Sequence, residues 1–576
     1  MDERYFFERN LLALASSDPE LARRLTKSIT TQGRYKNLLS RTGETVPALV
    51  DNSGAAHPLH SLMDPRREGK RLVETLRGGG FIVFLGLGGG FAVEAALERS
   101  DVTGIAIVEY DIDACAELLA SKEYIKIFGD PRVHLLVDPD EKELRDFILQ
   151  TYQPALFGGI SVLPLRTRLE WAEATFNRAT ETIRSAIDAI SDDYSVQAYF
   201  GKRWFSNTIR NVRVADRIQE PLAPIRNIAI TAAGPSLDDQ IGLLKEKRSS
   251  HYLLATDTSL PALLAQDLQP DAVISIDCQH ISYYHFMRGI PKNTTLFLDL
   301  ASPPLVASQA PQPRFFSGGH PLTRYVSQHW RPFPQIDTSG GNVTYAAVVL
   351  ADLLGAERIE LYGADFSYPQ GSSYARETYI HTYFQKFQNR FLPLETEFIQ
   401  FLFRNESLDR VFSRGFWRYE TKPLEGYRKK LERLSQTLGA QLVPIPGRGH
   451  PIDVGLVKPP RIRGAIPLFS SGRSNSTSDD FLRGYRERLG ELTPLQGSLA
   501  SYLSKLDGES RDLLMTLLPT AAALKKKNPH LTPGETIEAV KAFGIAELDR
   551  LLKPSQGPIA DEGFIHANIG AGAVGQ

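Results

Sequence analysis

The chain has very little cysteine, with only Cys115 and Cys278 among its 576 residues. Two cysteines this far apart form no metal-ligand pattern and no disulfide framework, so neither a zinc site nor a disulfide-rich fold is supported. The sequence also lacks a basic surplus, because 66 Lys and Arg residues face 67 Asp and Glu residues. This balance argues against nucleic-acid binding as the main role.

Long apolar segments are missing as well. No apolar run reaches the roughly 18 residues that a transmembrane helix needs, so we expect no membrane span. The first residues, Met1 to Tyr5, lack the apolar core of a secretory signal peptide. We therefore expect a cytoplasmic protein. The proportions of hydrophobic residues (42%) and charged residues (23%) are ordinary for a globular protein, and the length predicts about three domains.

The pattern along the chain predicts an α/β protein in three parts. Residues 1–222 form an N-terminal domain with a Rossmann-like core at about 80–140 and a helical connector, whose aromatic residues at 194–207 we expect to pack against the next domain. Residues 223–455 form a central domain with a mostly parallel sheet, and residues 456–576 form a linker and a C-terminal helical domain. The segment 470–478 reads as a flexible linker, and the tail from residue 568 as disordered.

A glycine-rich turn stands out in the N-terminal part. The apolar strand 81–85 leads into Gly86–Gly90, and the next strand ends at Glu109. An acid about 20 residues beyond such a turn is where ribose hydroxyls are held in nucleotide-binding folds. The layout resembles the front half of S-adenosylmethionine-dependent methyltransferases and polyamine synthases, but Phe84 stands where those families carry an acid. We interpret this part as a non-catalytic scaffold, with nucleotide binding and methyl transfer as alternatives.

Polar residues follow each of four strands in the central part. The predicted strands are 227–231, 252–255, 272–276 and 295–298. Their carboxyl ends release small polar or acidic residues: Gly234, Pro235, Ser236 and Leu237 after the first, Thr256, Asp257 and Thr258 after the second, Asp277 and His280 after the third, and Asp299 after the fourth. Parallel strands share one carboxyl edge, where open α/β sheets bind ligands, so the sequence predicts a site there.

A second polar loop opens a helix further along the chain. Ser339 is a good N-cap residue, and Gly340 and Gly341 let the backbone take positive φ next to Asn342. The segment 343–354 reads as a buried helix, and a strand at 358–362 leads to Asp365. Because helix N-termini bind anions, this loop predicts a phosphate site.

These motifs, in this order, carry a family resemblance. Gly-Pro-Ser-Leu at 234–237, the polar cluster after the second strand, and the run from Ser339 through Asp365 to Tyr374 resemble bacterial sialyltransferases that use CMP-activated sugars. The central domain is more similar still to the motility-associated-factor (Maf) glycosyltransferases. This resemblance implies transfer of a sialic-acid-like nonulosonic acid from a CMP donor to Ser or Thr hydroxyls of flagellin. The same domain also resembles archaeal 6-hydroxymethylpterin diphosphokinases (MptE-like).

The resemblance implies roles by position. The turn Gly234, Pro235, Ser236, Leu237 and the loop Ser339, Gly340, Gly341, Asn342 would hold the donor phosphate, Thr256, Asp257 and Thr258 would contact ribose or cytosine, and Asp365 and Tyr374 would complete the pocket. Each residue has an alternative as a helix cap or strand end. The base histidine of the sialyltransferases is missing near Thr421, so the candidate bases are Asp277, His280, His320 and His381.

Three functions remain open at this point. A sialyltransferase-like reaction requires no cofactor and no metal. A pterin diphosphokinase would need Mg²⁺, for which Asp257, Asp277 and Asp299 offer carboxylates. A non-catalytic flagellar assembly factor would keep the fold without turnover.

Overall fold

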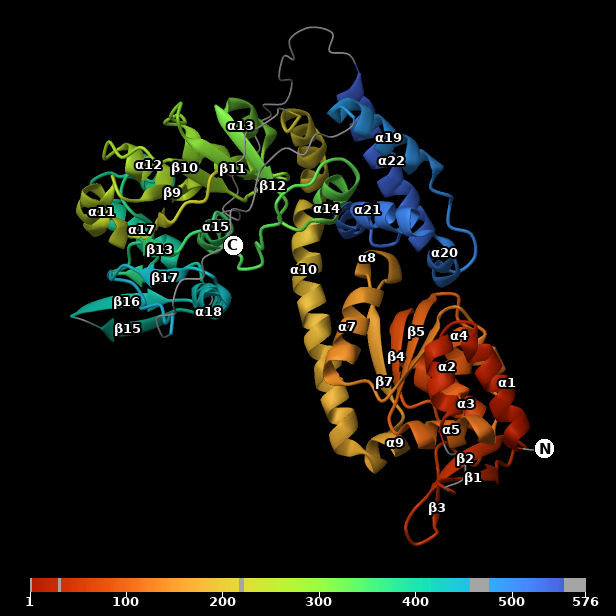
Figure 1. Cartoon of the computed structure of the whole chain (residues 1–576). Coiled ribbons are helices and arrows are strands. Elements are labelled where there is room, and N and C mark those ends of the chain that lie inside the picture. The colour runs from red at the N-terminus through yellow and green to blue at the C-terminus, as the bar shows by residue number, and fades with distance from the viewer. Residues whose placement is uncertain are drawn as a thin grey trace.

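The computed structural model describes residues 3–28, 33–216, 222–405, 407–413, 415–455 and 476–553. It has three parts arranged around the 42-residue helix α10 (Glu173–Val214), which runs from the N-terminal domain to the other two (Figure 1). The predicted α/β class is confirmed. Most of the predicted linker at 470–478 and the whole tail from residue 568 lie outside the described residues.

The N-terminal domain has an antiparallel sheet β1–β2–β3 and a parallel sheet in the order β6–β5–β4–β7. The bounds are α1 Glu3–Ala15, α2 Pro19–Thr26, β1 Tyr35–Leu39, β2 Thr45–Val50, β3 Ala56–Pro58, α3 Pro65–Glu74, β4 Gly80–Leu85, α4 Phe91–Leu97, β5 Val102–Glu109, α5 Ile112–Ser121, α6 Ile125–Phe128, β6 Val133–Val137, α7 Glu141–Thr151, α8 Pro154–Phe157, β7 Ile160–Pro164 and α9 Arg166–Trp171. The first strand of the parallel sheet, β4, lies inside it, as in Rossmann folds.

The helix α10 belongs to two cores. Its first half buries Phe176 and Ile183 against the N-terminal parallel sheet. Its second half buries Phe205, Ile209 and Val212 in a core shared with the central sheet and the C-terminal helices. The prediction that the aromatic segment 194–207 packs against the next domain is therefore confirmed.

The central domain is a seven-stranded sheet in the order β12–β11–β10–β9–β8–β13–β17, and all its pairs are parallel. The bounds are β8 Asn227–Thr231, α11 Ser236–Lys247, β9 Tyr252–Thr256, η1 Asp257–Ser259, α12 Leu260–Leu264, β10 Ala272–Ser275, η2 His280–Phe286, β11 Thr295–Asp299, α13 Pro304–Gln309, β12 Gln312–Phe316, α14 Pro321–His329, α15 Val343–Leu353, β13 Arg358–Tyr362, β14 Tyr368–Pro369, α16 Tyr379–Phe387, α17 Leu394–Leu402, β15 Asp409–Ser413, β16 Phe416–Glu420, α18 Lys422–Thr437 and β17 Gln441–Pro444. A small antiparallel sheet, β14–β16–β15, lies between β13 and β17 in the chain.

Helices cover both faces of this sheet. Leu237 and Leu244 of α11 and Leu263 of α12 contribute to one core, whereas the apolar side of α15, with Leu431 of α18, contributes to the core of the other face. Because β8 is the first strand and lies inside the sheet, the chain moves outward to β12 and then returns to β13 on the other side of β8. The carboxyl ends of β8 and β13 therefore mark the topological switch point, where doubly wound sheets bind ligands.

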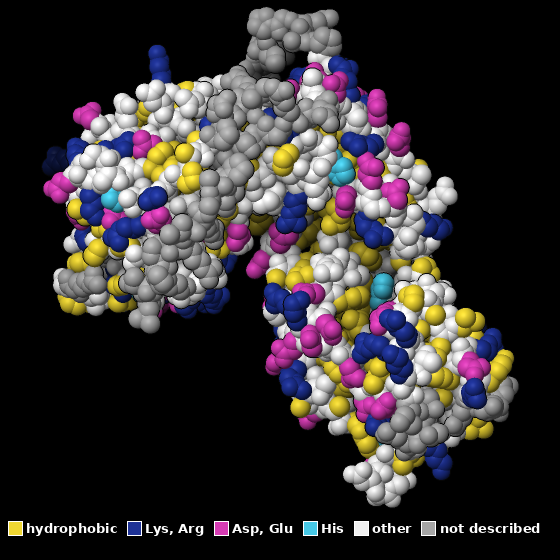
Figure 2. Space-filling view, in the orientation of Figure 1, with side chains coloured by type: hydrophobic (Ala, Val, Ile, Leu, Met, Phe, Trp, Pro, Cys, Tyr) yellow, Lys and Arg dark blue, Asp and Glu magenta, His cyan; other side chains and the backbone are white. Residues whose placement is uncertain are grey.

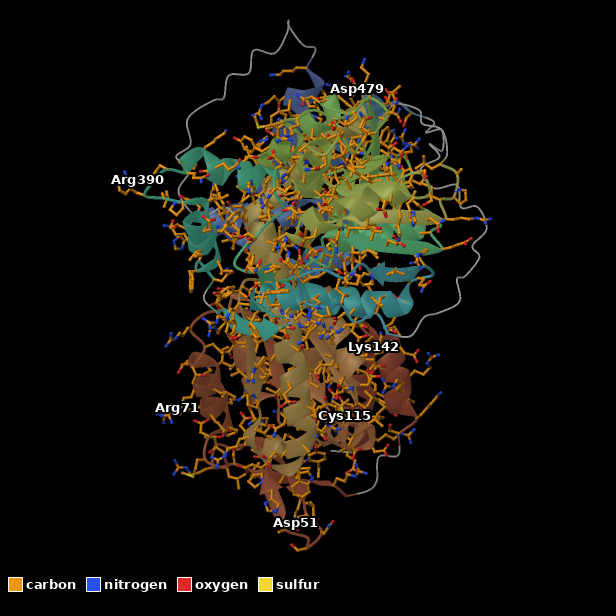
Figure 3. All side chains as sticks on the ribbon, turned by 90° about the vertical axis from the view of Figure 1, so that its left-hand side faces the viewer. Asp51, Arg71, Cys115, Lys142, Arg390 and Asp479 are labelled. Carbon is orange, nitrogen blue, oxygen red and sulfur yellow. The ribbon has the colours of Figure 1, made fainter. Side chains whose placement is uncertain are left out.

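The C-terminal helices connect the other two parts. They are α19 Ser478–Glu491, α20 Leu499–Lys505, α21 Gly508–Lys527 and α22 Pro533–Leu552. Leu517 and Tyr485 join the core of the central domain, whereas Leu514 and Leu518 join the core of the N-terminal domain. In the space-filling view the N-terminal domain forms a lower lobe beside the joined central and C-terminal parts (Figure 2). The turned view shows the long dimension of the molecule, with Asp51 at one end and Asp479 at the other (Figure 3).

Candidate active site

The switch point is organised by a carboxylate at the start of α11. Asp365, in the loop after β13, accepts hydrogen bonds from the Ser236 amide (2.9 Å) and from the Ser236 hydroxyl. Burial raises the pKa of Asp365, and the bonds from Ser236 oppose this shift. Gly234 leaves the space for this contact, since a Cβ there would lie 2.3 Å from Oδ2 of Asp365. The structure thus brings together two predicted site residues that are 129 positions apart.

The backbone amides of this turn already donate hydrogen bonds to other groups of the protein. The Gly234 amide donates to the Gly363 carbonyl (2.8 Å), and the Leu237 amide donates to the Gly234 carbonyl (3.0 Å). Pro235 has no amide hydrogen. A donor phosphate at this helix start would have to displace Asp365 from the Ser236 amide.

A segment that the sequence analysis did not assign to the site covers the turn. The Arg448 amide donates to the Ser236 hydroxyl oxygen (2.6 Å), and its guanidinium donates to the Pro235 carbonyl (2.8 Å) and pairs with Asp239 (2.8 Å). Gly449 passes so close to Asp365 that a Cβ would lie 2.3 Å from the Asp365 Cα. The signal in the sequence is the run Gly447-Arg-Gly-His450 directly after the last strand of the sheet.

The loops after β9 and β10 meet beside the switch point. Asp257 accepts hydrogen bonds from the Thr258 amide (2.7 Å) and the Ser275 hydroxyl (2.6 Å), which fix its carboxylate. Thr256 is 0% exposed, and its hydroxyl has no hydrogen-bond partner among the described residues. Burial, together with the nearby negative charge of Asp257, raises the pKa of Asp277. These loops therefore provide two groups that could act on a ligand. The Thr256 hydroxyl is buried without a hydrogen-bond partner among the described residues, and the Asp277 carboxylate has a raised pKa.

The glycine loop before α15 lies at the same edge of the sheet. Asn342 is the N-cap and accepts a hydrogen bond from the Tyr345 amide (2.9 Å), while Gly341 has a φ of +77°. Gly340 is packed under the ring of Tyr345, and the Ser339 amide is bonded to Asp337 (2.8 Å). The loop is thus held in a defined shape, and Ser339 and Gly341 are exposed on its surface.

The remaining candidates lie in different surroundings. His280 is exposed at the start of η2. His381 is buried on α16 against the ring of Phe398, and burial lowers its pKa. Tyr374 belongs to the same small aromatic cluster, where burial raises its pKa to about 12. Among the charged groups that act on the Asp277 carboxylate are Asp257, His285 and Arg203.

Asp299 and His320, a possible magnesium ligand and a candidate base from the sequence, also lie at this edge of the sheet. Asp299, at the end of β11, is buried, and burial raises its pKa, which the charge of His320 opposes. The His320 ring packs against the Trp204 ring of α10, with the ring centroids 4.1 Å apart and the planes tilted by 32°. From the sequence, Trp204 is expected only to pack between domains. Its contact with His320 could not be predicted, because Trp204 lies on a helix assigned to a different domain.

The glycine turn of the N-terminal domain is closed by its own side chains. Glu109 is 1% exposed and accepts hydrogen bonds from the Leu87 amide (2.6 Å) and from Arg168 (2.7 Å). The Tyr124 hydroxyl donates to the Gly88 carbonyl (2.7 Å). The carboxylate that would hold a ribose is therefore already bonded within the protein, in keeping with a scaffold.

Comparison with known proteins gives the relationship of the chain. A family profile described as "6-hydroxymethylpterin diphosphokinase MptE-like" matches residues 202–371. An uncharacterized protein of Treponema pallidum (strain Nichols) is 34% identical over 169 residues, which is 29% of this chain and 80% of that protein. The chain belongs to the same family as this Treponema protein. A second uncharacterized Treponema protein is 27% identical over 305 residues, covering 52% of this chain and 65% of that one.

A solved structure gives the fold of the whole chain. It is described as "Structure of MAf glycosyltransferase from Magnetospirillum magneticum AMB-1", and it covers 95% of this chain and 91% of its own. The TM-score is 0.54 and the identity 15%, so the likeness establishes the fold. The resemblance noted from the sequence, a Maf-type chain with an MptE-like central domain, is thus confirmed.

Two features are absent from the described residues. No three His, Cys, Asp or Glu side chains come together as a metal site within the described ranges. No helix in the described part of the chain is long and apolar enough to cross a membrane.

Proposed function

We propose that the chain is a glycosyltransferase that moves a nonulosonic acid from a CMP-activated donor to Ser or Thr hydroxyls of flagellin in the cytoplasm, supporting flagellar assembly and motility. The observation that supports this most is the gathering of the polar loops after β8, β9, β10, β11 and β13 at one edge of a parallel sheet. The family match at 202–371 contains all of these loops and the glycine loop before α15. The Maf-type fold agrees with the same reaction class.

The donor would occupy the edge between the glycine loop and the loop after β9. The Thr256 hydroxyl, which has no hydrogen-bond partner among the described residues, is suited to a hydrogen bond with the nucleoside, next to Asp257 and Thr258. Ser339, Gly341 and Asn342 would face the phosphate at the start of α15. In this arrangement Asp365 orders the neighbouring turn through Ser236 and does not itself reach the donor.

Asp277 is the strongest candidate for the base, with His280 and His381 as alternatives. Its raised pKa brings the carboxylate closer to the range in which a general base works near neutral pH. In the transfer, the acceptor oxygen forms a bond to the anomeric carbon while the bond from that carbon to the phosphate oxygen breaks. The hydroxyl proton goes to the base, and CMP leaves with the electron pair.

The description of the matched family favours a second candidate, a 6-hydroxymethylpterin diphosphokinase-like phosphoryl transfer. That reaction would need ATP with Mg²⁺, which Asp257 and Asp277 could help to bind. A third possibility from another class is a flagellar assembly factor that binds flagellin without turnover.

Intact-mass spectrometry of flagellin separates these functions. We expect flagellin incubated with the full chain and a CMP-activated nonulosonic acid to gain the mass of one or more sugar residues, and flagellin from cells without the chain to lack it. In thermal unfolding, CMP at about 100 times its Kd should stabilise the chain by roughly 2.7 kcal/mol. Stabilisation by ATP with Mg²⁺ but not by CMP would favour the diphosphokinase, and flagellin binding without any mass gain would favour the assembly factor.

A further inference from the structure

The end of α10 is fixed on the loops of the candidate site by two buried asparagines. Asn211 donates hydrogen bonds to the carbonyls of Leu300 (2.8 Å) and Ser302 (2.7 Å), in the loop after β11. Asn207 donates to the carbonyls of Ala301 (2.8 Å) and Cys278 (3.1 Å), so it joins the loop after β11 to the loop after β10. From Asn211 to Asn207, one helical turn toward the N-terminus of α10, the hydrogen bonds thus extend from the loop after β11 to the loop after β10.

This geometry continues for one more turn. Residues four apart lie on the same face of a helix, so Arg203 follows Asn211 and Asn207 on the face that contacts the loops. A turn rises about 5.4 Å and neighbouring strands lie about 4.8 Å apart, so the next turn reaches from β10 toward β9. The charge of Arg203 acts on both Asp277 and Cys278, which agrees with this placement.

The guanidinium of Arg203 is available for a ligand. The Arg203 side chain is half-buried, and within the described part of the chain no hydrogen bond or ion pair engages it. Its guanidinium carbon lies 6.0 Å from the centre of the Phe200 ring. By contrast, Arg448 and Lys430 at the same edge already bond to protein groups. The nearby acids Asp257 and Asp277 would repel an anionic substrate, so an anion there needs a cation beside it.

We propose that Arg203 binds an anionic oxygen of the donor, so that the connector helix completes the active site of the central domain. The inference rests on the proposed function, because it concerns the substrate of that site. A CMP-activated nonulosonic acid offers two such groups, the phosphate and the sugar carboxylate, and the planar guanidinium fits either through paired hydrogen bonds. The family match begins at residue 202, so it includes this last part of α10.

Calorimetric titration of the full chain with CMP and with CMP-N-acetylneuraminic acid tests the proposal. Charge-assisted bonds of this kind predict that Arg203→Gln weakens binding by about 10- to 100-fold, with a smaller loss for Arg203→Lys. Equal losses for both probes would assign Arg203 to the phosphate, and a loss confined to the sugar nucleotide would assign it to the carboxylate. The matched control is Lys202→Gln, since the Lys202 ammonium lies over the ring of Phe543, 5.2 Å from its centre, in the C-terminal helices.

The outcomes separate the inference from the proposed function. If the wild-type chain binds the probes and Arg203→Gln binds both with wild-type affinity, the inference is overturned while the function stands. If the wild-type chain binds neither probe, the function is overturned and the inference with it. Arg203 has no hydrogen-bonded partner to lose within the described residues, so we expect its variants to unfold at the wild-type temperature.

Discussion

Replacing Asn207 by leucine should loosen the loops that form the candidate site. The side chain is buried and donates to two carbonyl oxygens, at 2.8 Å from Ala301 and 3.1 Å from Cys278. Leucine has a similar size but no donor, so both carbonyls would stay buried without this partner. Each unsatisfied group costs about 1–3 kcal/mol, so the two carbonyls together give a loss of roughly 2–6 kcal/mol for the substitution.

Hydrogen exchange followed by mass spectrometry gives a local measurement of this loss. We expect faster exchange in peptides that cover residues 276–282 and 299–304, together with a lower unfolding temperature. Asn177→Leu is the matched control, because it makes the same change on an exposed position of the same helix. If Asn207→Leu exchanges and unfolds like Asn177→Leu, the two hydrogen bonds do not hold the loops, and the placement of α10 argued above is wrong.

Three further predictions concern the scaffold. Gly201→Ala should destabilise the chain by at least the 1–3 kcal/mol of ordinary overpacking, because its Cβ would lie 1.8 Å from the Pro519 carbonyl oxygen; thermal unfolding measures this. Glu109→Gln should cost about 3–5 kcal/mol in urea unfolding, since the buried guanidinium of Arg168 loses its charged partner. Against the effect of burial, bonds from neighbouring Lys, Tyr and Arg side chains lower the pKa of Glu360 from 4.5 to about 2. The stability that Glu360 adds over Glu360→Gln should therefore be complete above pH 4.5 and disappear as the pH falls toward 2.

Each of these has its own control. Gly242→Ala changes a helical glycine with open space around it and should leave stability unchanged or slightly improved, so equal behaviour of the two alanine variants would refute the close contact at Gly201. Glu98→Gln removes an exposed ion pair and should cost less than 1 kcal/mol. A stability difference for Glu360→Gln that does not change between pH 6 and pH 3 would contradict the ion-pair explanation.

Strands inside the central sheet could be predicted from the sequence, whereas the outermost strand β12 could not. The strands at 227–231 and 358–362 have the predicted bounds, because β-branched and large apolar residues recur through each of them, as is typical of strands in a buried parallel sheet. The strand β12 was missed. It contains Pro313, which argues against a central strand but is tolerated in β12 because this strand lies at the edge.

The ends of helices, and contacts between residues far apart in the chain, could not be predicted from the sequence for a different reason. The pattern of residues 3–25 is typical of one amphipathic helix, but Asp18 caps a second helix that begins at Pro19. In contrast, most of the helical connector is one continuous helix of 42 residues, α10. Local composition determines neither result, because caps and packing decide where a helix ends. The pairing of Ser236 with Asp365, and the approach of Arg203, depend on topology that a single sequence does not show.

The contacts of Asp365 at the switch point restrict where an anionic ligand can bind. The start of α11 is where a doubly wound fold offers amides to a phosphate, and in this chain the Asp365 carboxylate is bonded there. A second anion at this position would meet the Asp365 charge as well as lose the Ser236 bonds. An anionic donor is therefore better placed one or two strands away, where the glycine loop before α15 begins a second helix and Arg203 provides a cation that pairs with no acid among the described residues. On this argument Asp365 and the connector helix act together, because one closes the usual anion site and the other supplies its replacement.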